Sequence, residues 1–275
     1  MVLGLEELKR LLRPSIESTP TRRSLRIGGD SGALHIHRLL NAHPDLFKEQ
    51  LRLHRVFEDC VGALDGTHIQ AIISADSEGI PFRGRKGIKT RNILACCSFD
   101  RIFIFINMGW EGSVHDITVW VDSLTQSKYD FPHPPTGKYY LVDSGYPNTT
   151  GYLYPIKDPN VRYHIPEFKK KRVLRGMSEQ FNYRHSSLRT TVKRAFGNLK
   201  KRWKILYTMP QMEDIYQLYV IVATFTLHNF IRMCKLGIHV SAHDINVHGR
   251  VDSDLLNPTR KEAMNKVHKE IILRI

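Results

Sequence analysis

Two aspartates of this 275-residue chain stand in similar surroundings, each directly after a short apolar run and just before a glycine turn. Asp65 lies in the run GALDGTHI and Asp143 in the run YYLVDSGYP, while Asp116 lies between them in GSVHD. Divalent ions catalyse phosphodiester cleavage or transfer where carboxylates from different strands converge at one end of a sheet. Hard oxygen ligands of this kind select Mg²⁺ or Mn²⁺. The three aspartates are therefore candidates for a metal site acting on phosphodiesters.

Each aspartate also has a structural explanation, which for a single residue is the more common one. Asp65, followed by glycine, suits a tight hairpin turn. Asp116 stands three residues after Ser113 and completes a capping box at a helix start. Asp143, followed by serine and glycine, suits an Asx-turn. The residues by themselves leave both interpretations open.

Short apolar runs separated by turn residues predict the elements that position these aspartates. The runs CVGAL, HIQAII, NILACCSF and RIFIFINMG predict three or four strands of one sheet, and YYLV predicts another. Helices are predicted over residues 113–124, with Ser113 as N-cap, over about 186–203 and over about 214–234. A long polar and basic loop is expected over residues 147–183. This order predicts an α/β fold with a mixed sheet flanked by helices.

Three regions are predicted along the chain. Residues 1–55 form an N-terminal helical segment and linker, residues 56–234 form the main domain, and residues 235–275 form a polar C-terminal tail. The four cysteines show no CxxC spacing, which argues against a zinc finger and favours a reduced compartment, the cytosol or nucleus. The N-terminus lacks an apolar signal core, and the apolar stretch 215–231 is interpreted as a buried helix rather than a membrane span.

The positive charge of the chain is concentrated in one block. The net charge is +14, and residues 160–204 hold fourteen Lys or Arg against two Glu, a net of +12. Such a block is typical of a protein that binds the phosphate backbone of nucleic acid. Its candidate phosphate contacts are His185, Arg189, Arg194 and Lys200. A solvated surface, or a nuclear-import signal around FKKKR, is the alternative.

Four motifs in series resemble one known family. GALDGTHI, GSVHD, VDSGYP and FNYRHSSLRTTVKRAFGNLKKRWKIL occur in the order found in the PIF/Harbinger class of DDE transposases and their domesticated relatives. The resemblance covers about residues 57–233 and is strongest to plant-type members. It implies an RNase H-like nuclease fold, a divalent-metal site, DNA as substrate, a nuclear location and a Myb-like protein partner. By the same resemblance, Asp65 and Asp143 match the catalytic aspartates, and Asp116 matches a further acidic position grouped with the metal ligands.

One position departs from the family pattern. The family's remaining acid is the glutamate of a V-E-R-x-F-G run, and here that position holds Lys193. An ammonium group in place of a carboxylate turns attraction for a divalent cation into repulsion, so cleavage should be impaired. Glu179 precedes Lys193 by fourteen residues, about 21 Å along a continuous helix, and replaces the missing acid only if the chain folds back near Asn182.

Three hypotheses follow from these observations. The first is a Harbinger-type nuclease-fold protein that keeps DNA affinity and binds a metal through Asp65, Asp116 and Asp143 but cleaves poorly. The second is a domesticated, non-catalytic nuclear factor for DNA binding or protein interaction. The third is a decaying transposon copy. Only 64 residues precede Asp65, so the N-terminal region is expected to be shortened relative to complete family members.

Overall fold

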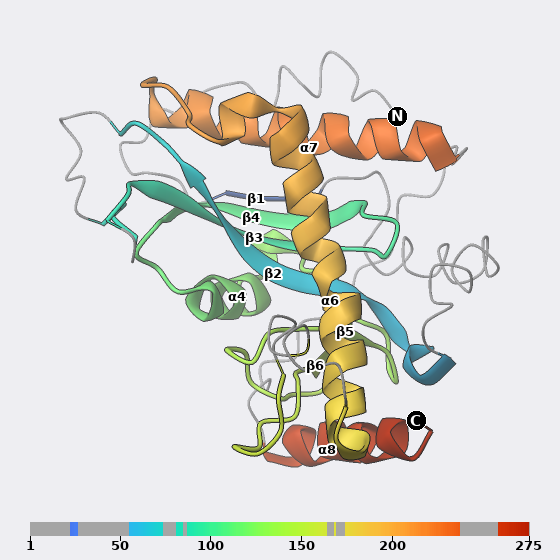
Figure 1. Ribbon diagram of the computed structural model, residues 1–275. Coiled ribbons are helices and arrows are strands. Elements are labelled where there is room, and N and C mark those ends of the chain that lie inside the picture. Colours follow the sequence, from blue (N-terminus) through green and yellow to red (C-terminus); the bar gives the residue numbers. More distant parts are fainter. Residues whose placement is uncertain are drawn as a thin grey trace.

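The chain forms a mixed sheet with helices on both faces (Figure 1). The computed structural model describes residues 23–26, 55–73, 81–84, 87–163, 168, 174–236 and 258–274. The sheet has six strands in the order β1-β4-β3-β2-β5-β6. Most of the predicted N-terminal segment, 1–55, lies outside the described residues. The part of it that is described includes a short strand, β1 (Arg23–Arg26), which pairs with β4.

The centre of the sheet consists of three consecutive antiparallel strands. These are β2 (Cys60–Gln70), β3 (Thr90–Cys97) and β4 (Phe103–Glu111). The short strands β5 (Tyr139–Leu141) and β6 (Tyr152–Leu153) continue the sheet in parallel to β2. Three antiparallel strands followed by parallel ones, with helices on both faces, confirm the predicted α/β, RNase H-like architecture.

The runs CVGAL and HIQAII form one strand rather than two. Asp65 lies in the middle of β2, where it pairs with Ala95 of β3, and Gly66 pairs with Leu94. The hairpin turn suggested by the aspartate and glycine pair is therefore wrong. Gly66 serves another purpose, because the carboxylate of Asp116 occupies the space where a Cβ atom would lie.

Alternate residues of the strands pack into two apolar cores, one on each face of the sheet. On β3, Ala95 and Cys97 face the core beneath α6, whereas Leu94 and Cys96 face the core beneath α4. This period of two is what a strand buried on both faces requires. The sheet is thus a fixed platform between the helix that carries most of the positive charge and the helix that begins at Asp116.

The helix α4 (Asp116–Thr125) starts later than predicted. Its N-cap residue is His115, so the proposed capping box from Ser113 is wrong. Ser113 instead lies in the turn after β4, where its backbone N–H donates to the carbonyl of Pro81. Asp116 therefore does not form a capping box with Ser113. It belongs to the first turn of α4, next to β2.

The basic helix α6 (Gly176–Arg202) is longer than predicted and has no break near Asn182. The Asn182 side chain bonds the backbone N–H and carbonyl of Ile156 and the carbonyl of Arg162. These contacts fix the preceding loop against the helix. The sequence predicted a helix start near residue 186 because the polar residues before it resemble a loop. In the structure, these residues belong to α6, and Asn182 among them contacts the preceding loop.

Two further helices complete the fold. The helix α7 (Asp214–Leu236) matches the prediction for 214–234, and none of the described helices is long and apolar enough to span a membrane. The helix α8 (Pro258–Leu273) differs from the expected polar tail, because Met264 and Ile271 are buried in the core on the α6 side of the sheet. In Figure 1, α7 and α8 lie near opposite ends of α6.

Candidate active site

The first candidate residue, Asp65, is held in a buried position between β2 and α6. Only 6% of the residue is exposed, because it lies in mid-strand under the basic helix. Asp143 follows the end of β5, the strand that pairs in parallel with β2. Asp65 and Asp143 are far apart in sequence. The parallel pairing of β2 and β5 brings them to the same part of the sheet.

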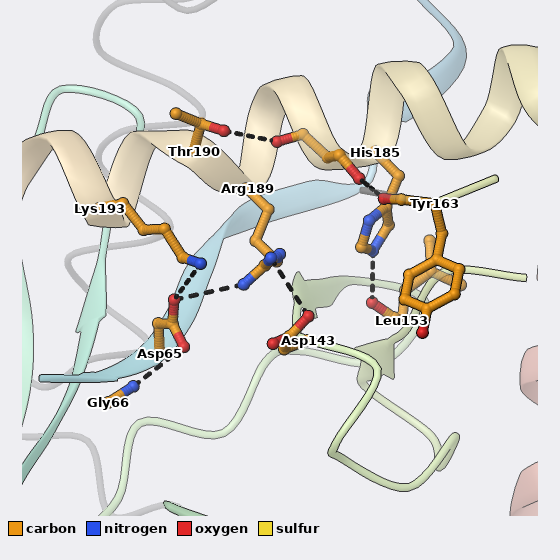
Figure 2. Close-up of polar contacts among 10 residues, drawn as sticks. Asp65, Gly66, Asp143, Leu153, Tyr163, His185, Arg189, Thr190 and Lys193 are labelled. Atoms are coloured by element: carbon orange, nitrogen blue, oxygen red, sulfur yellow. Dashed lines mark hydrogen bonds and ion pairs between the residues drawn. The ribbon is translucent and has the colours of Figure 1, made fainter. Parts of the chain in front are cut away.

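A single arginine bridges the two carboxylates (Figure 2). Arg189 of α6 is 8% exposed, and its Nη1 donates to Asp65 Oδ2 at 3.2 Å. Its Nη2 lies 3.2 Å from Asp143 Oδ1. One planar guanidinium thus forms ion pairs with two carboxylates, one in β2 and one just after β5. The single ammonium group of a lysine does not offer this geometry. Arg189, predicted from the sequence as a phosphate contact, thus has a bridging role that its position in the chain did not indicate.

Lys193 lies one helical turn after Arg189 and points to the same acid. Its Nζ is 3.8 Å from Asp65 Oδ2, and 54% of its side chain is exposed. Residues four apart lie on one helix face, which is why both cations meet Asp65. The helix therefore presents two positive charges to this carboxylate.

Asp116 approaches β2 from the start of α4. Its carboxylate packs against Gly66, the residue after Asp65, and its Oδ1 accepts a hydrogen bond of 2.8 Å from Asn92 Nδ2. The same amide nitrogen also donates to the carbonyl of Val114 at 2.9 Å. Asn92 thus fixes the position of Asp116 beside the strand. Any side chain at Gly66 would displace it.

The charges around Asp65 act on it in opposite directions. Burial raises the pKa of Asp65 to about 6, because the carboxylate loses its hydration. The positive charges of Arg189 and Lys193 lower this pKa. The negative charges of Asp143 and Asp116 raise it. All three aspartates therefore share one electrostatic neighbourhood, and Asp65 is mostly ionised at neutral pH.

Tyr146, in the same VDSGYP run as Asp143, lies close to all three aspartates and was not predicted as a site residue. Its ring packs edge-on against Trp120 of α4, with ring centroids 5.8 Å apart. Its hydroxyl is buried and has no hydrogen-bond partner among the described residues. Burial, and then the charges of Asp116 and Asp65, raise the pKa of Tyr146, so the hydroxyl stays protonated beside the acids. No sequence signal distinguished it from an ordinary core tyrosine.

Comparison with known proteins decides the family. Residues 64–229 match the family described as DDE superfamily endonuclease. The chain belongs to this family. The match begins one residue before Asp65 and includes α4, Asp143 and all of α6. The family-level resemblance predicted from the four motifs is confirmed.

The chain is also similar to three mammalian proteins named "Putative nuclease HARBI1". The protein from Rattus norvegicus is 25% identical over 172 residues, which is 62% of this chain and 45% of the relative. Those from Bos taurus and Homo sapiens are each 24% identical over the same shares. The chain thus matches less than half the length of these relatives, and no solved structure matches it. These similarities support a transposase-derived nuclease fold.

Nucleases of the DDE endonuclease family generally use divalent metal ions, and a site for such an ion requires oxygen ligands that are free to bind it. Carboxylate oxygens are suitable donors for Mg²⁺. As arranged here, however, the residues do not fit one. Arg189 takes the position between Asp65 and Asp143, and Lys193 adds a second positive charge at Asp65. Among the described residues, no group of three or more His, Cys, Asp or Glu is arranged to hold a metal.

Glu179 does not take the place of the acid that the family resemblance predicts at position 193. It is buried near the start of α6, where the Nε and Nη2 of Arg162 donate to its two carboxylate oxygens at 2.9 and 2.7 Å. The backbone N–H of Arg175 donates to it as well, at 2.7 Å. These bonds lower the pKa of Glu179 to about 2. Because α6 is continuous, Glu179 cannot fold back toward Lys193.

The four proposed phosphate contacts differ in what they touch. His185 is fully buried and donates from Nε2 to the carbonyl of Leu153 at 2.9 Å, and burial lowers its pKa to about 3. It is neutral and out of reach of a phosphate. Arg189 is engaged by the aspartates. Lys200 donates to Thr67 Oγ1 at 2.9 Å and to a backbone carbonyl of β2. Arg194 alone of the four is exposed.

Proposed function

We propose that this chain is a DNA-directed nuclease-fold protein, derived from a transposase, in which phosphodiester cleavage is impaired. The observation that carries the proposal is the position of Lys193, whose Nζ lies 3.8 Å from Asp65 Oδ2. The family resemblance puts an acid at this helix position, and here a cation stands beside the buried carboxylate. The resemblance implies metal binding by Asp65, Asp116 and Asp143, but the cations Arg189 and Lys193 oppose it in the present arrangement.

The electrostatic argument concerns the total charge near Asp65. Two unit charges 4 Å apart interact by about 4 kcal/mol at an effective dielectric constant of 20, a typical value near a protein surface. A divalent ion placed at Asp65 would be repelled by Lys193 with twice the charge product of such a pair, and it would also have to displace Arg189. Asp65 and Asp143 are already paired with cations of α6. A metal therefore gains less from binding them than it would at an uncompensated pair of carboxylates.

DNA as the substrate or ligand is supported by the family and by the basic surface of α6. The exposed cations near the C-terminal end of this helix are Arg194, Lys201 and Arg202, followed by Lys204. Cations arranged along one element bind phosphate backbones through release of counterions. We further propose the nucleus as the compartment and a Myb-like protein as a partner, as the resemblance implies.

A nicking assay tests the impairment. Labelled duplex DNA is incubated with the full chain and Mg²⁺ or Mn²⁺, and we expect little cleavage by the unmodified protein. The variant Lys193→Glu should cleave more and should be stabilised against heat by Mg²⁺, because it restores an acid beside Asp65. Lys261→Glu on α8 is the matched control, since it makes the same charge change at an exposed residue outside both the site and the basic surface of α6. Robust cutting by the unmodified protein, abolished by Asp65→Ala, would overturn the proposal.

A second candidate function is that of a non-catalytic DNA-binding or protein-interaction factor. The bridge from Arg189 to both aspartates favours it, because this bridge gives the carboxylates a structural role that needs no metal. The same assays separate the two functions. If Lys193→Glu neither cleaves DNA nor responds to Mg²⁺ while salt-dependent DNA binding persists, the non-catalytic function is the better description.

A further inference from the structure

A second cationic site lies between the C-terminal ends of α6 and α7, apart from the aspartates. A cavity of about 450 Å³ is lined there by Asn198, Lys201, Arg202, His228, Ile231, Arg232 and Lys235. At 3.6 residues per turn, Arg202 lies about 180° around α6 from Lys193, so the cavity and Asp65 are reached from different faces of the helix. We name this cavity the α6–α7 pocket.

We propose that the α6–α7 pocket binds phosphate groups of a nucleic-acid backbone. Four of its lining side chains are cationic, two from each helix, and none of the described lining residues is acidic. Lys201, Arg202 and Lys235 form no ion pair with any carboxylate in the described part of the chain. Like charges gathered in a concave surface raise the local concentration of anions.

The walls of the pocket are held in place by neutral groups. The Nε and Nη2 of Arg232 donate to the carbonyl of Asp100 at 3.0 and 2.7 Å. His228 donates from Nε2 to the carbonyl of Arg101 at 2.9 Å. Both carbonyls belong to the turn between β3 and β4. Carbonyls carry no net charge, so these bonds orient the Arg232 guanidinium, and the nearby charge of Asp100 offsets part of its positive charge.

Neighbouring charges act on two of the pocket side chains. Burial lowers the pKa of Arg232, the charge of Arg101 lowers it further, and the charge of Asp100 raises it. Burial also lowers the pKa of His228, with contributions in the same direction from Arg232 and Arg202. His228 is therefore neutral at pH 7. The C-terminal dipoles of α6 and α7 offset part of the repulsion among the cations, since cations are favoured at helix C-termini.

The size and lining of the pocket indicate the class of ligand. Its volume lies within the range of ligand pockets, about 300–1,000 Å³, and its lining combines four cationic side chains with apolar surface from Ile231 and the aliphatic stems of the lysines and arginines. A polyanion matches it, and an oriented guanidinium with adjacent lysines suits phosphate oxygens. The choice of DNA as the polyanion rests on the proposed function. The pocket would add the α7 cations Arg232 and Lys235 to the basic surface of α6, of which Lys201 and Arg202 are already part.

The test is a salt titration of DNA binding, followed by fluorescence anisotropy of a labelled duplex. The variant Lys201→Gln/Lys235→Gln removes two exposed pocket cations. Lys261→Gln/Lys269→Gln removes two exposed cations from α8, which packs near the other end of α6. Losing two phosphate contacts should reduce the slope of log affinity against log salt by about 2. The α8 variant should leave the slope unchanged.

A pocket variant with the same slope and affinity as the unmodified chain would overturn the proposal. Thermal unfolding of both variants serves as the folding control, and because all four lysines are exposed we expect no loss of stability. Pyrophosphate binding, measured by calorimetry, separates the two proposals. If the unmodified chain binds pyrophosphate through the pocket lysines but not DNA, the proposed function fails together with the choice of DNA as the ligand, while the affinity of the pocket for phosphate stands. If it binds neither, the pocket proposal fails as well.

Discussion

Both halves of α6 carry basic side chains, yet the two halves use them differently. In the N-terminal half, Arg189 is buried and bridges two aspartates, and His185 is neutral and bonded to a carbonyl. In the C-terminal half, Arg194 and Lys201 are exposed. A count of positive charges treats these residues alike. Their availability to a phosphate depends on which carboxylates and carbonyls the fold brings to each position.

The largest effect is expected at the bridge of the N-terminal half. Arg189→Gln leaves the buried Asp65 and the partly exposed Asp143 without their shared cation. Removing one partner of a buried ion pair costs about 3 kcal/mol or more, so we expect a loss of that size in the free energy of unfolding. Urea denaturation at pH 7 measures it.

Neutralising the acid at the same time should recover part of this loss. In the double variant Asp65→Asn/Arg189→Gln, no uncompensated charge remains at Asp65, so the two changes should not be additive. Additive losses would show that Arg189 stabilises the fold through packing alone, and the distinction between the two halves of α6 would weaken.

An intermediate effect is expected at the start of the same half, and it depends on pH. The pKa of Glu179 is lowered from 4.5 to about 2 by Arg162 and the backbone N–H of Arg175. A depressed folded-state pKa gives stability that is present above the unfolded pKa of about 4.5 and is lost as the pH falls toward 2. Between pH 4.5 and 2, the free energy of unfolding should therefore fall less steeply in Glu179→Gln than in the unmodified chain.

At neutral pH, Glu179→Gln should be less stable than the unmodified chain, by less than Arg189→Gln, because Arg162 retains access to water. Asp122→Asn on α4 controls for removal of one carboxylate elsewhere. Parallel acid denaturation curves for the unmodified chain and Glu179→Gln would contradict a role for this ion pair in stability.

The smallest effect is expected at the exposed cation of the C-terminal half. Arg194→Gln should change the free energy of unfolding by less than about 0.5 kcal/mol, as surface substitutions do. If Arg194 contacts a phosphate, the same change should reduce the salt slope of DNA binding by about 1. A stability loss comparable to that of Arg189→Gln would show that the two halves of the helix do not differ as described.

Much of the fold was predictable because local patterns and tertiary packing agree. The strands around NILACCSF and RIFIFINMG, and the helix over 214–234, follow from apolar runs that the sheet and its two cores bury. The incorrect predictions were made where local signals were ambiguous. Asp65 and Gly66 are residue types common in turns, but their pairing with β3 makes them part of a continuous strand. Ser113 has the composition of a helix cap, but the turn after β4 already uses it.

The candidate site divides in the same way. By motif and spacing, the sequence alone determined the family. It also singled out Asp65 and Asp143 as candidates, and Lys193 as the position where the resemblance predicts an acid. Only the tertiary structure decided that Arg189 joins the two aspartates, because a guanidinium bridge requires two strands and a helix to meet. It also decided which cations remain exposed. Charge is a property of residues, whereas compensation of charge depends on distances that the chain acquires only when folded.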